Sequence, residues 1–132
     1  MFFQTRRAPW KPPTRSGYTT STSGEVISDG LLDIRDTAIT VNHYNVTIRN
    51  CKILYNGSNA GDAYGIYALA RSGLTVEDCE IINVGAPARG ELARATNSCI
   101  RYENGSDLTI TRVTTRRGSN GLQIINTANT AI

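Results

Sequence analysis

This 132-residue sequence is poor in the residues that build metal centres and disulfide frameworks. It has a single histidine, His43, with no partner in sequence, and three cysteines without metal-ligand spacing. No apolar run is long enough to cross a bilayer. We therefore expect no metal, no cofactor and no membrane insertion. A chain of this length forms at most one domain of ordinary size.

Positive charge is concentrated at the start of the chain. Residues 1–15 contain four basic and no acidic side chains, whereas the ten basic and eleven acidic residues of the remainder nearly cancel. Pro9, Pro12 and Pro13 in the same region exclude helix and favour extended structure. We interpret residues 1–24 as an extended basic arm, which either docks on a neighbouring chain or is a terminus without fixed structure.

The sequence also lacks a secretory signal and a strand face suited to nucleic acid. No apolar stretch follows the early charges, so no signal peptide is visible. This favours either release inside a virion or an extracellular protein whose signal has been removed. Nucleic acid is a poor partner, because the region after the arm is not basic and offers no aromatic stacking platform.

What the sequence does contain is a repeated strand pattern. An apolar residue, Thr and a β-branched apolar residue are followed by a polar pair, after which the apolar positions resume. The period of two predicts a strand with one buried face. The three copies are residues 46–53, 74–81 and 108–115. One residue of each polar pair is expected to form a bend: Asn50, Asp78 and Arg112.

A second, shorter strand is predicted at a fixed distance before these stretches. Ile66 lies eight residues before Leu74, and Ile100 lies eight before Leu108. The step from Ile100 to Leu122 is 22 residues. The steps from Ile66 to Ile100 and from Val46 to Leu74 are longer, and each equals this period plus an insertion in one return. A fixed core period with insertions at one place in the turn is typical of a solenoid.

The repeats resemble the right-handed parallel β-helix of pectate-lyase-like proteins, polygalacturonases and bacteriophage tailspikes. The resembling phrases are VTIRNCKI, YGIYALARSGLTVEDCEI and SCIRYENGSDLTI, and the resemblance covers about residues 30–132. It implies an all-β, right-handed, single-stranded parallel β-helix of about four rungs over residues 25–132. The pattern is specific for the fold and weak for any one function, because sites are grafted on folds.

Stacking of successive turns predicts columns of like residues inside the coil. Cys51 and Cys79 share one inward column, which Val113 continues. A strand spacing of about 4.8 Å permits a disulfide, but parallel side-chain directions disfavour it, so buried free thiols are expected. The apolar columns are Val46–Leu74–Leu108, Ile48–Val76–Ile110, Ile53–Ile81, which Thr115 weakens, and Ile66–Ile100–Leu122.

Charged residues on the outward face of the main strands are the weak candidates for catalysis. Arg49 is expected beside Glu77, and Lys52 beside Glu80, one rung apart. We interpret them as cross-strand pairs on a wet surface. The resemblance implies an alternative in which a basic residue abstracts a proton or two carboxylates act as acid and base. The acidic cluster that holds calcium in the family's lyases and the aspartate triple of polygalacturonases are both absent.

Two inserted returns are better candidates for recognition. Residues 55–64 and 85–97 are expected to leave the same corner on successive rungs, which would make them neighbours in space. Tyrosine faces beside Asn, Asp and Arg side chains suit a sugar ring, but a long return can equally pack on the coil. The candidate carbohydrate-binding residues in and beside these returns are Tyr55, Asp62, Tyr64, Tyr67, Arg89, Glu91, Arg94 and Arg101.

The last residues, 130–132, fall in register with residues 108–110, so the sequence stops within a strand pair. We expect either a longer β-helix or a coil covered by another chain, with a homotrimer as one arrangement. The leading hypothesis is a carbohydrate-engaging module of a virion or extracellular assembly, with a polysaccharide as its partner, similar to a tailspike. The alternative is the N-terminal part of a polysaccharide lyase or glycoside hydrolase that acts on an acidic polysaccharide.

Overall fold

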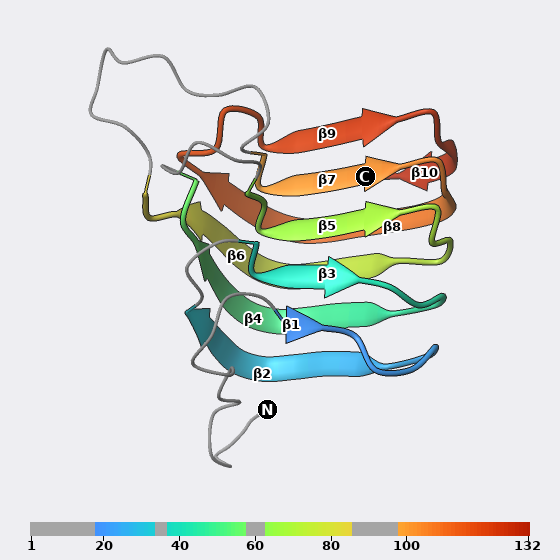
Figure 1. Ribbon diagram of the computed structural model, residues 1–132, viewed down its shortest axis with the longest axis horizontal. Helices are drawn as coiled ribbons and strands as arrows, with labels where there is room; N and C mark the ends of the chain where they lie inside the picture. Colours follow the sequence, from blue (N-terminus) through green and yellow to red (C-terminus); the bar gives the residue numbers. More distant parts are fainter. Residues whose placement is uncertain (1–17, 34–36, 58–62, 86–97) are drawn as a thin grey trace.

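The computed structural model describes residues 18–33, 37–57, 63–85 and 98–132 of the chain. In this part of the chain every regular element is a β-strand, and the ten strands form two parallel sheets (Figure 1). Each sheet has five strands, where the sequence predicted about four rungs. Within the same residues there is no helix that could span a membrane.

The shorter strands form one sheet in the order β1-β3-β5-β7-β9. Ile66 lies beside Ile39 on one side and Ile100 on the other, and Ile100 lies beside Leu122, which confirms the predicted column. The strands are β1 (Tyr18–Thr19), β3 (Ile39–Val41), β5 (Ile66–Leu69), β7 (Ile100–Glu103) and β9 (Leu122–Ile125).

The longer strands form the second sheet in the order β10-β8-β6-β4-β2. Val76 lies beside Ile48 and Ile110, and Thr130 lies beside Leu108, as the period of the sequence predicted. The strands are β2 (Val26–Asp33), β4 (Thr47–Tyr55), β6 (Thr75–Asn83), β8 (Ser106–Arg116) and β10 (Ala128–Ala131).

The coil begins earlier than the sequence suggested. Tyr18 of β1 pairs with Ile39 of β3, and the amide of Gly24 donates to the carbonyl of Tyr44 at 2.9 Å. These contacts place residues 18–24, which were expected in the arm, on the coil itself. The remainder of the expected arm, residues 1–17, lies outside the described residues.

Each long strand contains a left-handed residue that bends it without ending it. Asn50, Asp78 and Arg112 all have φ of 52°, which confirms the predicted bend, and Asp29 has φ of 61°. Asn and Asp tolerate this conformation better than other non-glycine residues. Their side chains also link the rungs, because Asn50 Nδ2 donates to Asp29 Oδ1 at 2.8 Å and Arg112 pairs with Asp78.

The core fills the space between the two sheets. Ile48, Ile53 and Ile81 have no measurable exposure, so the inward positions of the sequence pattern are the buried ones. Burial of such side chains is the main favourable term in folding. The three cysteines are buried beside them as free thiols, as predicted.

Candidate functional site

The outward side chains of the short-strand sheet form a continuous surface, which we call the outer face. Inward and outward positions alternate along β5 and β7, so Tyr67 and Arg101 point away from the core. Thr40 lies beside Tyr67, Tyr67 beside Arg101, and Arg101 beside Gln123. Two residues further along each strand, the outer face continues with Leu69, Glu103 and Ile125.

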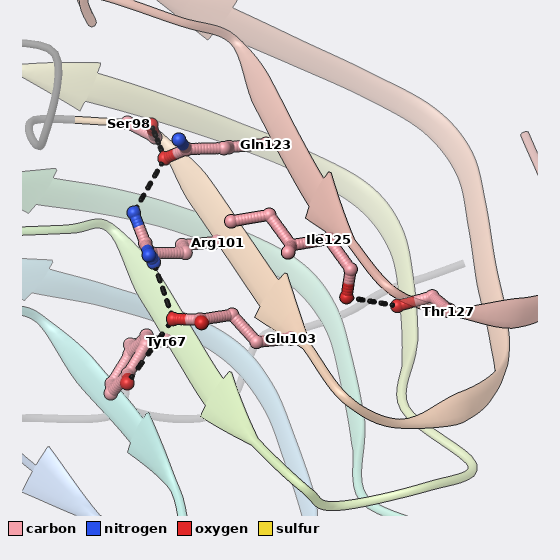
Figure 2. A network of polar contacts seen from close by, with 7 residues as sticks. All are labelled: Tyr67, Ser98, Arg101, Glu103, Gln123, Ile125 and Thr127. Carbon is pink, nitrogen blue, oxygen red and sulfur yellow. Dashed lines mark hydrogen bonds and ion pairs between the residues drawn. The ribbon is translucent and has the colours of Figure 1, made fainter.

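A network of polar contacts fixes the middle of the outer face (Figure 2). Arg101 Nε donates to Glu103 Oε2 at 2.6 Å, and Arg101 Nη1 donates to Gln123 Oε1 at 3.0 Å. The Ser98 hydroxyl also donates to Gln123 Oε1, at 2.9 Å, and the Tyr67 hydroxyl donates to Glu103 Oε2 at 3.4 Å. The guanidinium of Arg101 is thereby held between two rungs.

The ion pair at the centre of this network is partly shielded from water. The side chains of Arg101 and Glu103 are 19% and 18% exposed, respectively. The hydrogen bond to Glu103 raises the pKa of Arg101 further above its ordinary value. Partial shielding makes the pair stronger than a fully solvated one.

The network leaves hydrogen-bonding groups free on the outer face. Gln123 uses its oxygen for Arg101 and Ser98, and its amide NH₂ makes no hydrogen bond in the described part of the chain. Glu103 accepts through Oε2, so its Oε1 has no donor among the same residues. A donor and an acceptor are therefore presented together, which is the pair that a sugar hydroxyl can satisfy.

Tyrosine rings flank the ion pair. The rings of Tyr64 and Tyr67 stack with centroids 5.0 Å apart and planes inclined by 23°. The guanidinium carbon of Arg101 lies 5.6 Å from the centroid of Tyr64, within the range of a cation–π contact. Tyr64 is 4% exposed, so it supports Tyr67 from behind. Tyr67 is half-buried and is the ring that this pair presents to solvent.

One candidate on the predicted returns, Tyr55, does not lie on this surface. The prediction for Tyr55 is wrong, because its ring has no exposure and its hydroxyl contacts Cys99 Sγ at 3.6 Å inside the core. Burial also raises the pKa of the Tyr55 hydroxyl. The other four candidates on the returns lie outside the described residues: Asp62, Arg89, Glu91 and Arg94.

The weak catalytic candidates lie on the outward face of the long-strand sheet. Arg49 and Glu77 occupy paired positions, but among the described residues no ion pair joins them. Lys52 Nζ lies 3.9 Å from Glu80 Oε1, as predicted. The sequence did not predict that Arg116 Nε also pairs with Glu80, at 2.9 Å. This face carries solvated cross-strand ion pairs of small energetic value.

Sequence reasoning missed Glu103, Gln123 and Ser98 as members of the site. The signal for two of them was present, since Gln123 follows Arg101 by the 22-residue period and Glu103 is the next outward position of the same strand. Ser98 could not be found in this way, because it lies before the strand at the end of an inserted return. Within the described residues, no group of three His, Cys, Asp or Glu side chains could hold a metal ion.

Comparison with known proteins identifies the family. The model of a family described as the right-handed β-helix region matches residues 16–132, and the chain belongs to this family. No curated protein and no solved structure matched the chain significantly. Membership of the family supports a carbohydrate-binding or polysaccharide-active module and specifies nothing finer.

Proposed function

We propose that the outer face binds a polysaccharide chain. The observation that carries this proposal is the fixed Arg101–Glu103 pair, held at 2.6 Å between the ring of Tyr67 and the amide of Gln123. Sugars are recognised by a few well-placed hydrogen-bonding groups beside an apolar or aromatic surface. The face supplies both, on the strands of a rigid coil.

Preorganisation favours binding at this surface over binding at the surrounding solvated charges. Arg101 is already held by Glu103 and Gln123, so little side-chain entropy remains to be lost when a ligand arrives. The unused Gln123 amide and Glu103 Oε1 can then bond to hydroxyl groups. The ring of Tyr67 contributes contact area at low entropic cost.

The proposed setting is a virion or extracellular assembly in which the coil serves as a structural and receptor-binding module, as in a tailspike or fibre. Two features of the sequence support it: the resemblance of the repeats to such proteins and the concentration of positive charge in residues 1–15. In this setting the basic arm and the last rung contact other chains, for example in a homotrimer.

A catalytic role as part of a lyase or hydrolase has less support. Glu80 is engaged by Lys52 and Arg116, and Asp78 is engaged by Arg112. These carboxylates are neutralised by neighbouring cations, whereas a catalytic acid and base need environments that separate their pKa values. We therefore do not assign catalysis to Lys52 or Glu80, and we assign none to Arg49 or Glu77, which occupy paired positions without an ion pair among the described residues.

Glycan binding is tested on a panel of neutral and acidic oligosaccharides, with affinities measured by calorimetry for the wild type and two variants. Tyr67→Ala is expected to weaken binding by about tenfold, which corresponds to about 1.4 kcal/mol. Thr111→Ala, on the outward face of the long-strand sheet, is the matched control and should bind as wild type. Thermal melts verify that both variants are folded. No binding by the wild type, or equal losses in the two variants, would contradict the proposal.

A further inference from the structure

Two of the three buried cysteines lie one above the other in the core. Lys52 of β4 lies beside Glu80 of β6. Cys51 and Cys79 each precede one of these residues, so they occupy matching positions on adjacent rungs. Both are only 4% exposed, which keeps their sulfurs away from water. We call these two residues the cysteine pair.

The backbone presents the two sulfurs of the cysteine pair in the same direction. Each cysteine follows a left-handed residue, Asn50 or Asp78, and both of these have φ of 52°. Each Sγ lies 3.2 Å from the carbonyl oxygen two residues earlier in its own strand. Each also lies 3.7 Å from a carbonyl oxygen of the preceding rung. The two side chains therefore repeat one conformation, displaced by a strand spacing of about 4.8 Å.

This arrangement suits a metal ion between the sulfurs better than a disulfide. A disulfide needs two side chains that cross at a steep angle, whereas these two run alongside each other. Two metal–thiolate bonds of about 2.3 Å laid end to end span about 4.6 Å, close to the strand spacing. Side chains stand roughly perpendicular to a sheet, so an ion on the line between the sulfurs lies to the side of each Cβ–Sγ bond, where the sulfur lone pairs are.

The two sulfurs interact through a proton. The hydrogen bond with Cys79, followed by burial, raises the pKa of Cys51, and the same hydrogen bond lowers the pKa of Cys79. The thiol of Cys51 is therefore the donor, and the sulfur of Cys79 ionises first. A monovalent cation on the line between the sulfurs carries the same charge as the proton that it displaces there.

The number of ligands selects the kind of ion. Within the described residues, no group of three His, Cys, Asp or Glu side chains could hold a metal, so the cysteine pair offers two thiolates and no third ligand of these types. Structural Zn²⁺ sites are almost always tetrahedral with four ligands, which the pair cannot supply. Cu(I) is a soft ion that thiolates select, and two collinear thiolates satisfy it.

We propose that Cys51 and Cys79 form a two-coordinate site for a soft monovalent cation, Cu(I), held on the line between their sulfurs. Binding breaks two S–H bonds, forms two Cu–S bonds and releases two protons, and no electron is transferred. Because protons compete for the thiolates, affinity for Cu(I) falls as pH falls. The site lies on the inward face of the long-strand sheet and does not depend on glycan binding at the outer face.

The test is an anaerobic titration of the reduced protein with Cu(I), in competition with a coloured Cu(I) chelator of known affinity. The wild type should bind one Cu(I) per chain, and X-ray absorption of the copper should show two sulfur ligands in a linear arrangement. Cys51→Ala and Cys79→Ala should each weaken binding by at least about a hundredfold, which is the upper end of what loss of a mere outer-shell partner costs.

The matched control is the third buried cysteine. Cys99→Ser removes a thiol that lies against the Tyr55 hydroxyl, keeps an acceptor for that hydroxyl, and should bind Cu(I) as wild type. Zn²⁺ in excess should not displace Cu(I) from the wild type. Thermal melts verify that all three variants are folded. No binding by the folded wild type, copper with three or four ligands, or an equal loss of affinity in Cys99→Ser and Cys79→Ala would overturn the proposal.

Discussion

At the scale of single residues, the left-handed positions determine where each long strand bends. Asn50 and Asp78 suit this conformation, but Arg112 occupies the same place with φ of 52°. A residue with an ordinary side chain costs roughly 1–2 kcal/mol in the left-handed region. The ion pair of Arg112 with Asp78 is solvent-exposed and offsets little of this.

Arg112→Asn should therefore stabilise the protein by about 1 kcal/mol, since Asn tolerates the left-handed backbone. The urea concentration at half-unfolding is the measurement. Thr111→Asn, one residue earlier, provides the comparison and should not stabilise, because Asn is depleted in regular strands. A lower midpoint for Arg112→Asn than for wild type would show that the ion pair outweighs the backbone strain.

The first rung carries a polar pair whose titration affects stability. Burial alone would raise the pKa of Glu25, but hydrogen bonds from the Tyr18 hydroxyl and from Ser21 outweigh it, and the pKa of Glu25 is lowered. Burial, followed by the bond to Glu25, raises the pKa of Tyr18 to about 12. The pair therefore stabilises the protein between these two titrations.

The sign of each pH effect follows from these directions. Stability from Glu25 is present above the unfolded pKa of about 4.3 and is lost as pH falls through the lower folded pKa. Stability from Tyr18 is present below pH 10 and is lost as pH rises through about 12. In Tyr18→Phe, the loss of thermal midpoint at acid pH and the loss at alkaline pH should both be smaller than in wild type. If the losses of thermal midpoint at acid and alkaline pH in Tyr18→Phe equal those of wild type, the Tyr18–Glu25 pair does not contribute to the pH dependence of stability.

At the scale of elements, close backbone approach between rungs depends on a glycine before β5. A Cβ placed on Gly65 would lie 2.5 Å from the carbonyl oxygen of Cys99 on the next rung and 2.4 Å from Ile81 Cγ2. The carbonyl oxygen of Cys99 is a backbone atom just before β7, so it cannot move away without displacing the chain there. Gly24 differs, because its φ is +78° but nothing lies within 4 Å of the corresponding Cβ.

Gly65→Ala should destabilise the protein by about 3 kcal/mol, at the upper end of what overpacking costs. Gly24→Ala adds left-handed strain without a clash and should cost only about 1 kcal/mol. Denaturant melts of the two variants compare these mechanisms directly. Equal losses in both would contradict the close rung-to-rung contact at Gly65.

Strand pairing is the part of the fold that the sequence predicted best. The columns through Ile48, Ile53 and Ile66 were found because similar apolar residues recur with the period of the coil. Every residue of such a column must lie on the buried face of its strand. The start of the coil was placed too late, since Tyr18 and Thr19 form a two-residue strand with too short a pattern to detect. Short edge strands are set by their neighbours more than by their own sequence.

At the scale of the whole molecule, the candidate site emerges from stacking and not from any local motif. Tyr67 and Arg101 were predicted, but their connection through Glu103 and Gln123 depends on three strands far apart in sequence. Tyr55 was misassigned because it was counted with the inserted return, whereas it continues the buried face of β4 two residues after Ile53 and contacts Cys99 in the core. The residue at which β4 ends and the return begins is the quantity that the sequence did not determine.

The most direct test of the account is a titration of the isotopically labelled protein with the tightest-binding oligosaccharide of the panel, followed by amide chemical shifts. The proposed surface predicts the largest changes at Tyr67, Leu69, Arg101 and Gln123. Thr75, at an outward position of the long-strand sheet, should remain unaffected. Changes centred on Thr75 and its neighbours, or no saturable change anywhere, would contradict glycan binding at the outer face.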